Sequence, residues 1–185
     1  MIFAFGKMLC WRAAAAAALF AVGFAACLAA CLGFAGAGLA QQSAVQAQNR
    51  MMCNDPKVND KDTIVGCTNL IKSGGDKKHV LAVDYDNRGS AYFNTGDYDH
   101  AIADYDQAIK LDPKFASPFS GRCAVWIKRG SLVSAIADCN QAIVLDPNLA
   151  IAYNDRGLAK QAQGDMAGGA ADIAHAHELD PTLGK

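Results

Sequence analysis

The strongest constraint in this sequence is a tripeptide that returns at a fixed interval. Leu-Asp-Pro occupies residues 111–113, 145–147 and 179–181, so the motif recurs every 34 residues. A period of this length is typical of a chain built from repeated helical hairpins, none of which buries its own apolar face alone. The period therefore predicts that successive units stack and share a core.

Other residues keep the same register when the units are taken as 82–115, 116–149 and 150–183. Positions 8, 20 and 27 of each unit hold small residues, and position 15 is always glycine. Small residues let two antiparallel helices approach closely, and the glycine suits the turn between them. We expect the proline of Leu-Asp-Pro to end the second helix, and Ser117-Pro118 to cap and start the first helix of unit 116–149. The residues that carry the register are Gly89, Cys123 and Gly157; Gly96, Gly130 and Gly164; Ala101, Ala135 and Gly169; and Ala108, Ala142 and Ala176.

The register closely resembles the tetratricopeptide repeat, in a form expected of an exported bacterial envelope protein. The resemblance implies an all-α fold, a right-handed solenoid of helix-turn-helix hairpins whose inner wall is concave. Residues 63–71 match residues 101–109 of the first full unit and are followed by the stop signal Ser73-Gly74-Gly75. We therefore expect residues 41–79 to form a linker and a half-repeat that makes a degenerate N-terminal capping hairpin, ahead of three repeats in residues 80–185.

The first 40 residues have the composition of an export signal. They contain two cations, Lys7 and Arg12, and no acid, and residues 13–40 carry no charge. Small residues close this run before a polar stretch, so cleavage between Ala40 and Gln41 is the first expectation. Two alternatives remain: the run is long enough to stay as a membrane anchor, or Leu28-Ala29-Ala30-Cys31 directs lipidation of Cys31. Each of them places the domain outside the cytosol, with any membrane contact made only through the leader.

Four of the seven cysteines lie in the domain that follows the leader. Cys123 and Cys139 occupy positions 8 and 24 of one unit, which face each other across a hairpin, and Cys53 precedes Cys67 by 14 residues. Reduced thiols would be expected in a cytosolic chain, but the leader favours an oxidising compartment. The sequence therefore predicts the disulfides Cys53–Cys67 and Cys123–Cys139.

An arginine at position 7 and an aspartate at position 23 occur together in every unit. Positions equidistant from the turn meet across an antiparallel hairpin, so each pair is expected to form a bidentate bridge. A substrate-binding arginine would occur once, which favours a structural role over a functional one. The pairs are Arg88 with Asp104, Arg122 with Asp138, and Arg156 with Asp172.

Composition and motifs argue against catalysis, metal binding and nucleic-acid binding. The 18 acidic residues all lie after residue 40, together with 15 of the 17 basic residues, and no basic run occurs. Three Asp-Tyr-Asp dyads at residues 84–86, 97–99 and 104–106 resemble metal-binding motifs, but residues two apart on a helix diverge. His175 and His177 share that spacing. No catalytic constellation is present, and we expect no cofactor and no metal.

The resemblance also implies which residues line the concave face, because positions 2, 5, 6, 9, 12 and 13 do so in the family. These positions give a mixed groove in which Phe93 and Ile127 are neighbouring apolar contacts flanked by Asn94 and Lys128. The branch of the family that binds chaperone tails holds a terminal carboxylate with Lys, Asn and Arg, whereas Asp86, Ser90, Gly121, Ile151 and Asp155 stand at those places here. The implied groove residues are Val83, Asp86, Asn87, Ser90, Phe93 and Asn94; Ser117, Ser120, Gly121, Ala124, Ile127 and Lys128; and Ile151, Asn154, Asp155, Leu158, Gln161 and Ala162.

Together these features predict an exported, non-enzymatic module that binds a protein or peptide segment on its concave face. The alternatives are a structural envelope protein that self-associates through its C-terminal helix, and a lipoprotein that acts as an assembly scaffold.

Overall fold

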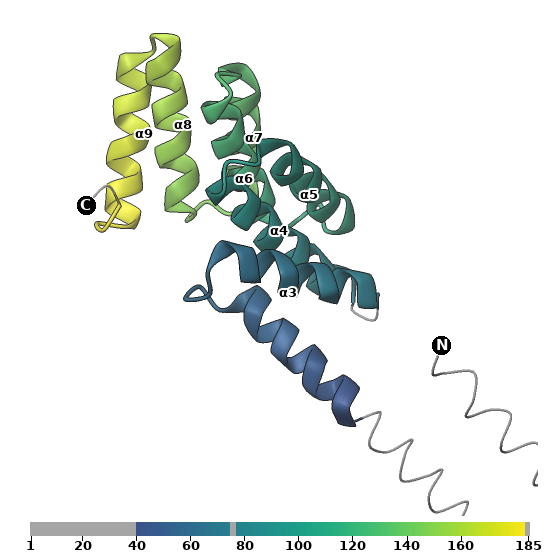
Figure 1. The fold of residues 1–185 in the computed structure, drawn as a ribbon. Coiled ribbons are helices and arrows are strands. Elements are labelled where there is room, and N and C mark those ends of the chain that lie inside the picture. Colours follow the sequence, from purple (N-terminus) through teal and green to yellow (C-terminus); the bar gives the residue numbers. More distant parts are fainter. Residues whose placement is uncertain (1–39, 75–76, 184–185) are drawn as a thin grey trace, which may run out of the picture. The chain divides into compact units, whose positions relative to one another are not determined.

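The computed structural model describes residues 40–74 and 77–183, and within them it contains helices and short connections but no strand (Figure 1). The residues from Gln46 onward form one compact unit, to which residues 40–45 do not belong. Ala40 and Gln41 are exposed and helical, while the rest of the expected leader, including Cys31, lies outside the described residues. Among the described residues, no helix combines the length and apolar character needed to cross a membrane.

Helices α4 to α9 form three successive antiparallel hairpins, and each helix packs most extensively on its partner in the hairpin. The first helices of the hairpins also contact one another, α4 with α6 and α6 with α8, and so form a continuous wall. The helices are α3 (Asp60–Ser73), α4 (Lys78–Asn94), α5 (Tyr98–Leu111), α6 (Ala116–Lys128), α7 (Leu132–Leu145), α8 (Ala150–Gln163) and α9 (Met166–Leu179).

The Leu-Asp-Pro motif ends the second helix of every hairpin. Helices α5, α7 and α9 all stop at its leucine. The aspartate then accepts a hydrogen bond from the backbone N–H two residues later, at 2.9–3.0 Å, and the proline between them has no N–H to donate. The motif therefore makes a fixed turn, which in the first two cases leads into the next hairpin.

The glycine at position 15 forms the turn inside each hairpin. Gly96, Gly130 and Gly164 have φ of 81°, 74° and 99°, a left-handed conformation that a side chain disfavours. The connection between the two helices of a hairpin is therefore short.

The start of α6 differs from the expectation drawn from Ser117-Pro118. The helix begins at Ala116, with Phe115 as its N-cap, so Ser117 lies inside the first turn. Its hydroxyl donates a 2.7 Å hydrogen bond to the buried Asp86 of the preceding hairpin. The prediction of an N-cap at Ser117 was wrong because this buried carboxylate recruits the hydroxyl. Pro118 is tolerated because the first N–H groups of a helix have no partner within it.

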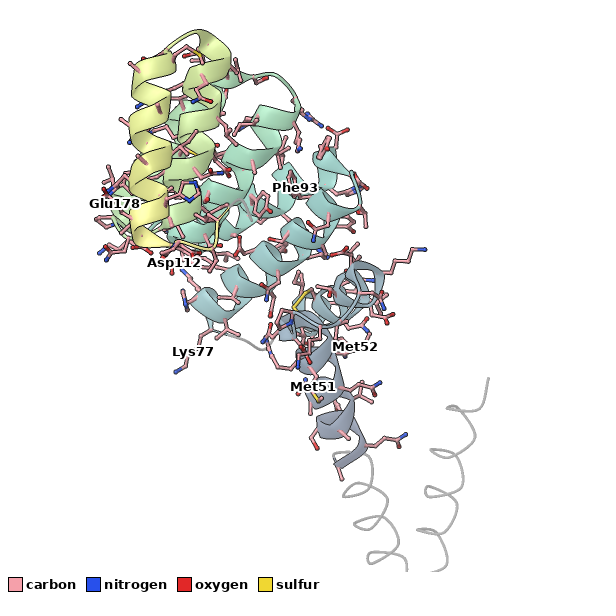
Figure 2. The ribbon with its side chains drawn as sticks, turned by 90° about the vertical axis from the view of Figure 1, so that its left-hand side faces the viewer. Met51, Met52, Lys77, Phe93, Asp112 and Glu178 are labelled. Atoms are coloured by element: carbon pink, nitrogen blue, oxygen red, sulfur yellow. A yellow bond between two sulfur atoms is a disulfide. The ribbon has the colours of Figure 1, made fainter. Side chains whose placement is uncertain are left out.

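The N-terminal cap also differs from the expected linker and half-repeat, because residues 40–54 are helical. Residues 46–54 pair with α3, whose N-terminus is capped by Asn59. The approach is close: a Cβ built on Gly66 would lie 2.6 Å from the Cβ of Met52, which lies near a disulfide in Figure 2. The cap is therefore a hairpin with two helices, which agrees with the expected N-terminal capping hairpin, and a helix occupies residues 41–54 where a linker was expected.

Candidate binding groove

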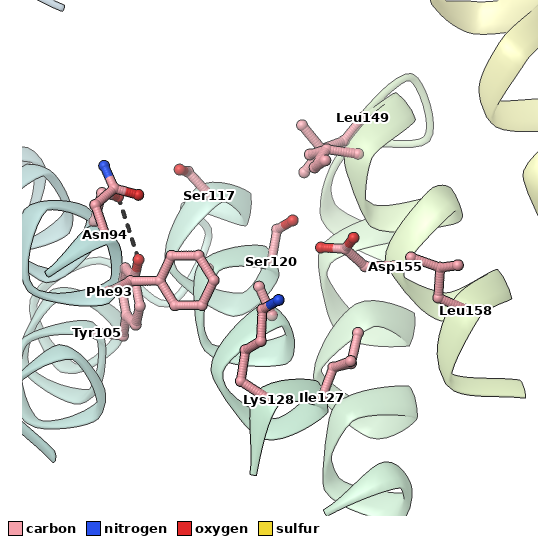
Figure 3. Close-up of a pocket in the computed structure, with 14 residues that line it drawn as sticks. Phe93, Asn94, Tyr105, Ser117, Ser120, Ile127, Lys128, Leu149, Asp155 and Leu158 are labelled. Atoms are coloured by element: carbon pink, nitrogen blue, oxygen red, sulfur yellow. Dashed lines mark hydrogen bonds between the residues drawn. The ribbon is translucent and has the colours of Figure 1, made fainter. Parts of the chain in front are cut away.

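The first helices of the three hairpins line a pocket of about 450 Å³, shown in Figure 3. Most of its lining comes from positions that the repeat register indicates. From α4 and α6 these are Ser90, Phe93, Asn94, Ser117, Ser120, Gly121, Ala124, Ile127 and Lys128, and from α8 they are Ile151, Asp155 and Leu158. We call this pocket the groove.

Tyr105 and Leu149 also line the groove, although sequence reasoning did not place them there. Tyr105 comes from the second helix of its hairpin. Its ring passes over two glycines: a Cβ on Gly89 would lie 2.9 Å from the ring, and a Cβ on Gly121 would lie 2.5 Å from it. The phenol oxygen then lies 3.2 Å from the Ser90 hydroxyl. The signal in the sequence was this pair of glycines, which leaves space for a ring.

The remaining expected groove residues lie outside the pocket lining. Asn87 donates a hydrogen bond to Asn54 of the N-terminal cap at 3.0 Å, and Asn154 donates one to Asp155. Asp86 is buried beneath Ser117. The expected residues that do not line the pocket are Val83, Asp86, Asn87, Asn154, Gln161 and Ala162.

Two charged side chains point into the groove, Asp155 from α8 and Lys128 from α6 (Figure 3). Burial raises the pKa of the Asp155 carboxyl to about 6, against the opposing effects of the Asn154 amide and the Lys128 charge. Lys128 itself is exposed. The groove therefore holds a partly desolvated carboxylate beside a cation that faces water.

A second carboxyl lies below the wall formed by α4 and α6. Asp86 is buried, and the hydroxyl of Ser117 donates to one of its oxygens, while the other has no hydrogen bond from any described residue. Burial raises its pKa to about 6, although the Ser117 hydrogen bond works in the opposite direction. Because the Ser117 hydroxyl donates its hydrogen bond to Asp86, the Ser117 oxygen remains free only to accept one.

The repeated arginine and aspartate side chains lie across the hairpins and not in the groove. Each arginine donates through Nε and Nη2 to both oxygens of its aspartate, at 2.6–2.8 Å. The remaining Nη1 reaches the preceding hairpin, at Thr68, Asp106 or Asn140. Sequence reasoning anticipated the first contact but missed the second, which joins neighbouring hairpins.

Both expected disulfides are present in the structure. Cys53 and Cys67 are joined with a Cα–Cα distance of 4.7 Å, and Cys123 and Cys139 with one of 5.5 Å. All four residues are buried. The first disulfide links the two helices of the N-terminal cap, and the second links α6 with α7 in the middle hairpin. Neither disulfide lines the groove.

In the described part of the chain, no group of three or more His, Cys, Asp or Glu side chains is placed to hold a metal ion, and the carboxylates of the Asp-Tyr-Asp dyads contact other residues. Their carboxylates bind different partners instead. In the second dyad, Asp97 bonds to His100 and Asp99 to Arg129, and in the third, Asp104 bonds to Arg88. Spacing on a helix explains the divergence in the first and third dyads, which lie within α4 and α5, whereas Asp97 of the second dyad is the N-cap of α5.

Antiparallel hairpins stacked around an inner groove define a helical-repeat protein. Residues 87–115 match the model of the tetratricopeptide repeat family. The TPR2B domain of yeast Sti1, solved as a complex with pHsp70, is 33% identical over 55% of this chain and 82% of that one, with a TM-score of 0.52. The chain belongs to the tetratricopeptide repeat family, whose fold is a protein-interaction scaffold.

Two further solved structures extend this comparison. The second TPR domain of human RPAP3, in complex with an HSP70 peptide, is 29% identical over 58% of this chain and 89% of that one, with a TM-score of 0.54. MamA shares the fold at 21% identity over 75% of this chain and 78% of that one, with a TM-score of 0.61. No curated protein sequence matches the chain significantly.

Proposed function

We propose that this protein binds a segment of another protein in the groove and has no catalytic role. The observation that carries the proposal is the exposure of Ile151 and Leu158, 41% and 44%, on the wall of a pocket that spans three helices. Large aliphatic side chains that stay exposed in a concave site are typical of a surface that a partner covers. Peptide complexes of the Sti1 and RPAP3 domains support the same use of the fold.

The groove differs in charge from one suited to an acidic chaperone tail. The peptide bound to the RPAP3 domain ends in Glu-Glu-Val-Asp. Asp155 lines the groove of this chain, Asp86 lies beneath its wall, and Lys128 is the one cation that the described residues contribute to the lining. An acidic peptide would meet like charge there, so we infer that the partner belongs to another chemical class.

Capture of partners by the full-length chain tests the function. Proteins retained from an envelope extract would be identified, prepared separately and titrated by calorimetry. Changing Phe93 and Ile127 to Asp places two charges in the groove and should weaken binding at least tenfold while the helical circular dichroism is kept. The matched control changes Val133 and Val144, exposed residues of α7 outside the groove, to Asp. Equal loss in both double variants, or loss only in the control, would move the binding surface away from the groove.

We also propose that the protein is exported. The leader composition supports this, and so do two disulfides, which persist in oxidising compartments. The mass of the protein recovered from the envelope distinguishes the routes. A product that begins at Gln41 indicates cleavage, a full-length mass indicates an anchor, and a lipid attached to Cys31 indicates a lipoprotein. Recovery in the cytosol with Cys53, Cys67, Cys123 and Cys139 all reduced would contradict export.

A further inference from the structure

The inner face of α8 carries an acid between two exposed aliphatic side chains. Ile151, Asp155 and Leu158 are spaced four and three residues apart, which places them on one face of a helix. All three line the groove. The middle hairpin has no such arrangement, because Gly121 stands at the position equivalent to Asp155.

Among the described residues, the Asp155 carboxylate has no strong partner. Its hydrogen bond from the Asn154 amide is long, at 3.4 Å. Lys128 attracts it, but burial still raises its pKa to about 6, so these two contacts do not replace the water that the carboxylate has lost. A cation brought by an occupant would supply the missing donors.

The part of the lining that comes from α6 favours a donor as well. The Ser117 hydroxyl donates its hydrogen bond to Asp86, so the Ser117 oxygen can only accept a hydrogen bond from an occupant. Phe93 of α4 and Ile127 of α6 add apolar surface to the lining. An occupant that suits this lining therefore carries apolar side chains together with a positively charged donor.

We propose that the groove recognises a polypeptide segment in which a lysine or arginine lies between apolar side chains. The cation pairs with Asp155, and the apolar side chains cover Ile151 and Leu158. This proposal rests on the proposed function, and adds to it the chemistry of the partner. This groove would therefore prefer a positively charged ligand, whereas a groove that binds an acidic tail prefers a negatively charged one.

Selection from a random twelve-residue peptide library, displayed on phage and panned on the full-length chain, tests the proposal. We expect the retained peptides to be enriched in Lys or Arg with apolar neighbours. The consensus peptide would then be synthesised and its Kd measured. Replacing its basic residue with Gln should weaken binding about tenfold, and this comparison requires no change to the protein.

Variants of the protein locate the contact. Asp155→Asn should weaken the basic peptide about tenfold and nearly abolish its advantage over the Gln peptide, while Asp155→Glu should retain that advantage. Glu178→Gln removes the same charge from an exposed site outside the groove and should leave the Kd unchanged. A basic peptide that binds Asp155→Asn as tightly as the wild type would overturn the proposal.

The other outcomes separate this proposal from the proposed function. If the selected peptides are apolar and lack Lys and Arg, and if the Phe93 and Ile127 double variant no longer binds them, the groove is supported as the binding site and the proposal of a basic partner is overturned. If the selected peptides are acidic and the Lys128→Gln variant no longer binds them, the groove is again supported and the proposal of a basic partner is again overturned. If no peptide is enriched, or if the enriched peptides bind the double variant normally, both the partner class and the groove fail.

Discussion

The middle hairpin, α6 with α7, and the last hairpin, α8 with α9, differ in what holds their two helices together where they cross. Both are bridged by a bidentate arginine and aspartate pair. At the point where their helices cross, the middle hairpin contains the disulfide Cys123–Cys139. The last hairpin has Gly157 there, and a Cβ on it would lie 2.7 Å from Ile173 and 2.8 Å from the carbonyl oxygen of Gly169.

The difference shows that two helices can be kept close either by a covalent bond between them or by a glycine that leaves room for their backbones to pack. A disulfide restricts the unfolded chain, whereas a glycine only permits contact in the folded one. The middle hairpin also packs against neighbours on both sides, while α8 and α9 have one neighbouring hairpin among the described residues. We therefore expect the last hairpin to open first, and it carries the Asp155 wall of the groove.

Removing the middle disulfide should have the largest effect on this contrast. Cys123→Ala with Cys139→Ala opens a loop closed over 16 residues, which the chain-entropy model values at about 3 kcal/mol. Urea unfolding followed by circular dichroism measures the change. The corresponding double variant of Cys53 and Cys67 opens a loop of similar size in the terminal cap, and should leave α6 and α7 protected from hydrogen exchange. Equal loss of protection in α6 and α7 in both variants would contradict the contrast.

A methyl group at the glycine crossing should have the next largest effect. Gly157→Ala brings a Cβ against backbone atoms of α9, which cannot rotate away, so the two helices must separate. We expect a loss of about 2 kcal/mol, typical of overpacking. Hydrogen exchange should show faster opening in α8 and α9, and little change in α6 and α7. Loss spread evenly over both hairpins would show that the last one does not open independently.

The features that could be predicted from the sequence are those tied to the 34-residue period. The arginine and aspartate pairs and the Cys123–Cys139 pair follow from positions that face each other within one hairpin. The features that were missed depend on contacts between hairpins. Ser117 turns to Asp86 of the preceding hairpin, and Tyr105 reaches the groove by passing Gly121 of the following one. A periodic pattern describes one unit, and does not specify which side chains meet when units stack.

The N-terminal cap shows a second limit of the sequence. Residues 46–54 carry none of the repeat positions, so their helix had no register to reveal it. Its contacts are local to the cap, such as the close approach of Met52 to Gly66 and the hydrogen bond from Asn69 to Asn49. Similarly, Leu149 lies in the turn before α8, outside the helix positions from which the groove was inferred.

The acid in the last hairpin should make stability depend on pH. The pKa of Asp155 is about 6 in the folded chain, against an ordinary value of 3.8, so between these values the folded chain holds more protons than the unfolded chain. Stability therefore falls as pH rises from about 4 to about 6. At about 1.4 kcal/mol for each tenfold change in the ionisation constant, the full cost is about 3 kcal/mol, which residual solvent contact lowers to about 2 kcal/mol.

Asp155→Asn removes this cost. We expect the variant to be more stable than the wild type by about 2 kcal/mol at pH 7.5, and equally stable near pH 3.5, where the wild-type carboxyl is protonated. Urea unfolding at a series of pH values measures the difference. A gain in stability that is the same at every pH would show that the ionised carboxylate carries no cost.

The smallest expected effect compares position 11 in the two hairpins, where each residue donates to the bridging aspartate. Trp126 Nε1 donates to Asp138 at 3.0 Å in the middle hairpin, and the Lys160 ammonium contacts Asp172 at 2.8 Å in the last one. Trp126→Phe removes a neutral donor, and Asp138 keeps both bonds from Arg122, so we expect a loss of about 1 kcal/mol that salt does not change. Lys160→Met keeps a similar length of apolar chain and removes a charge, and should cost about 0.5 kcal/mol in dilute buffer and nothing measurable in 1 M NaCl. Because only the ion pair is screened, salt should widen the difference between the two hairpins; equal salt sensitivity would mean that the two donors act in the same way.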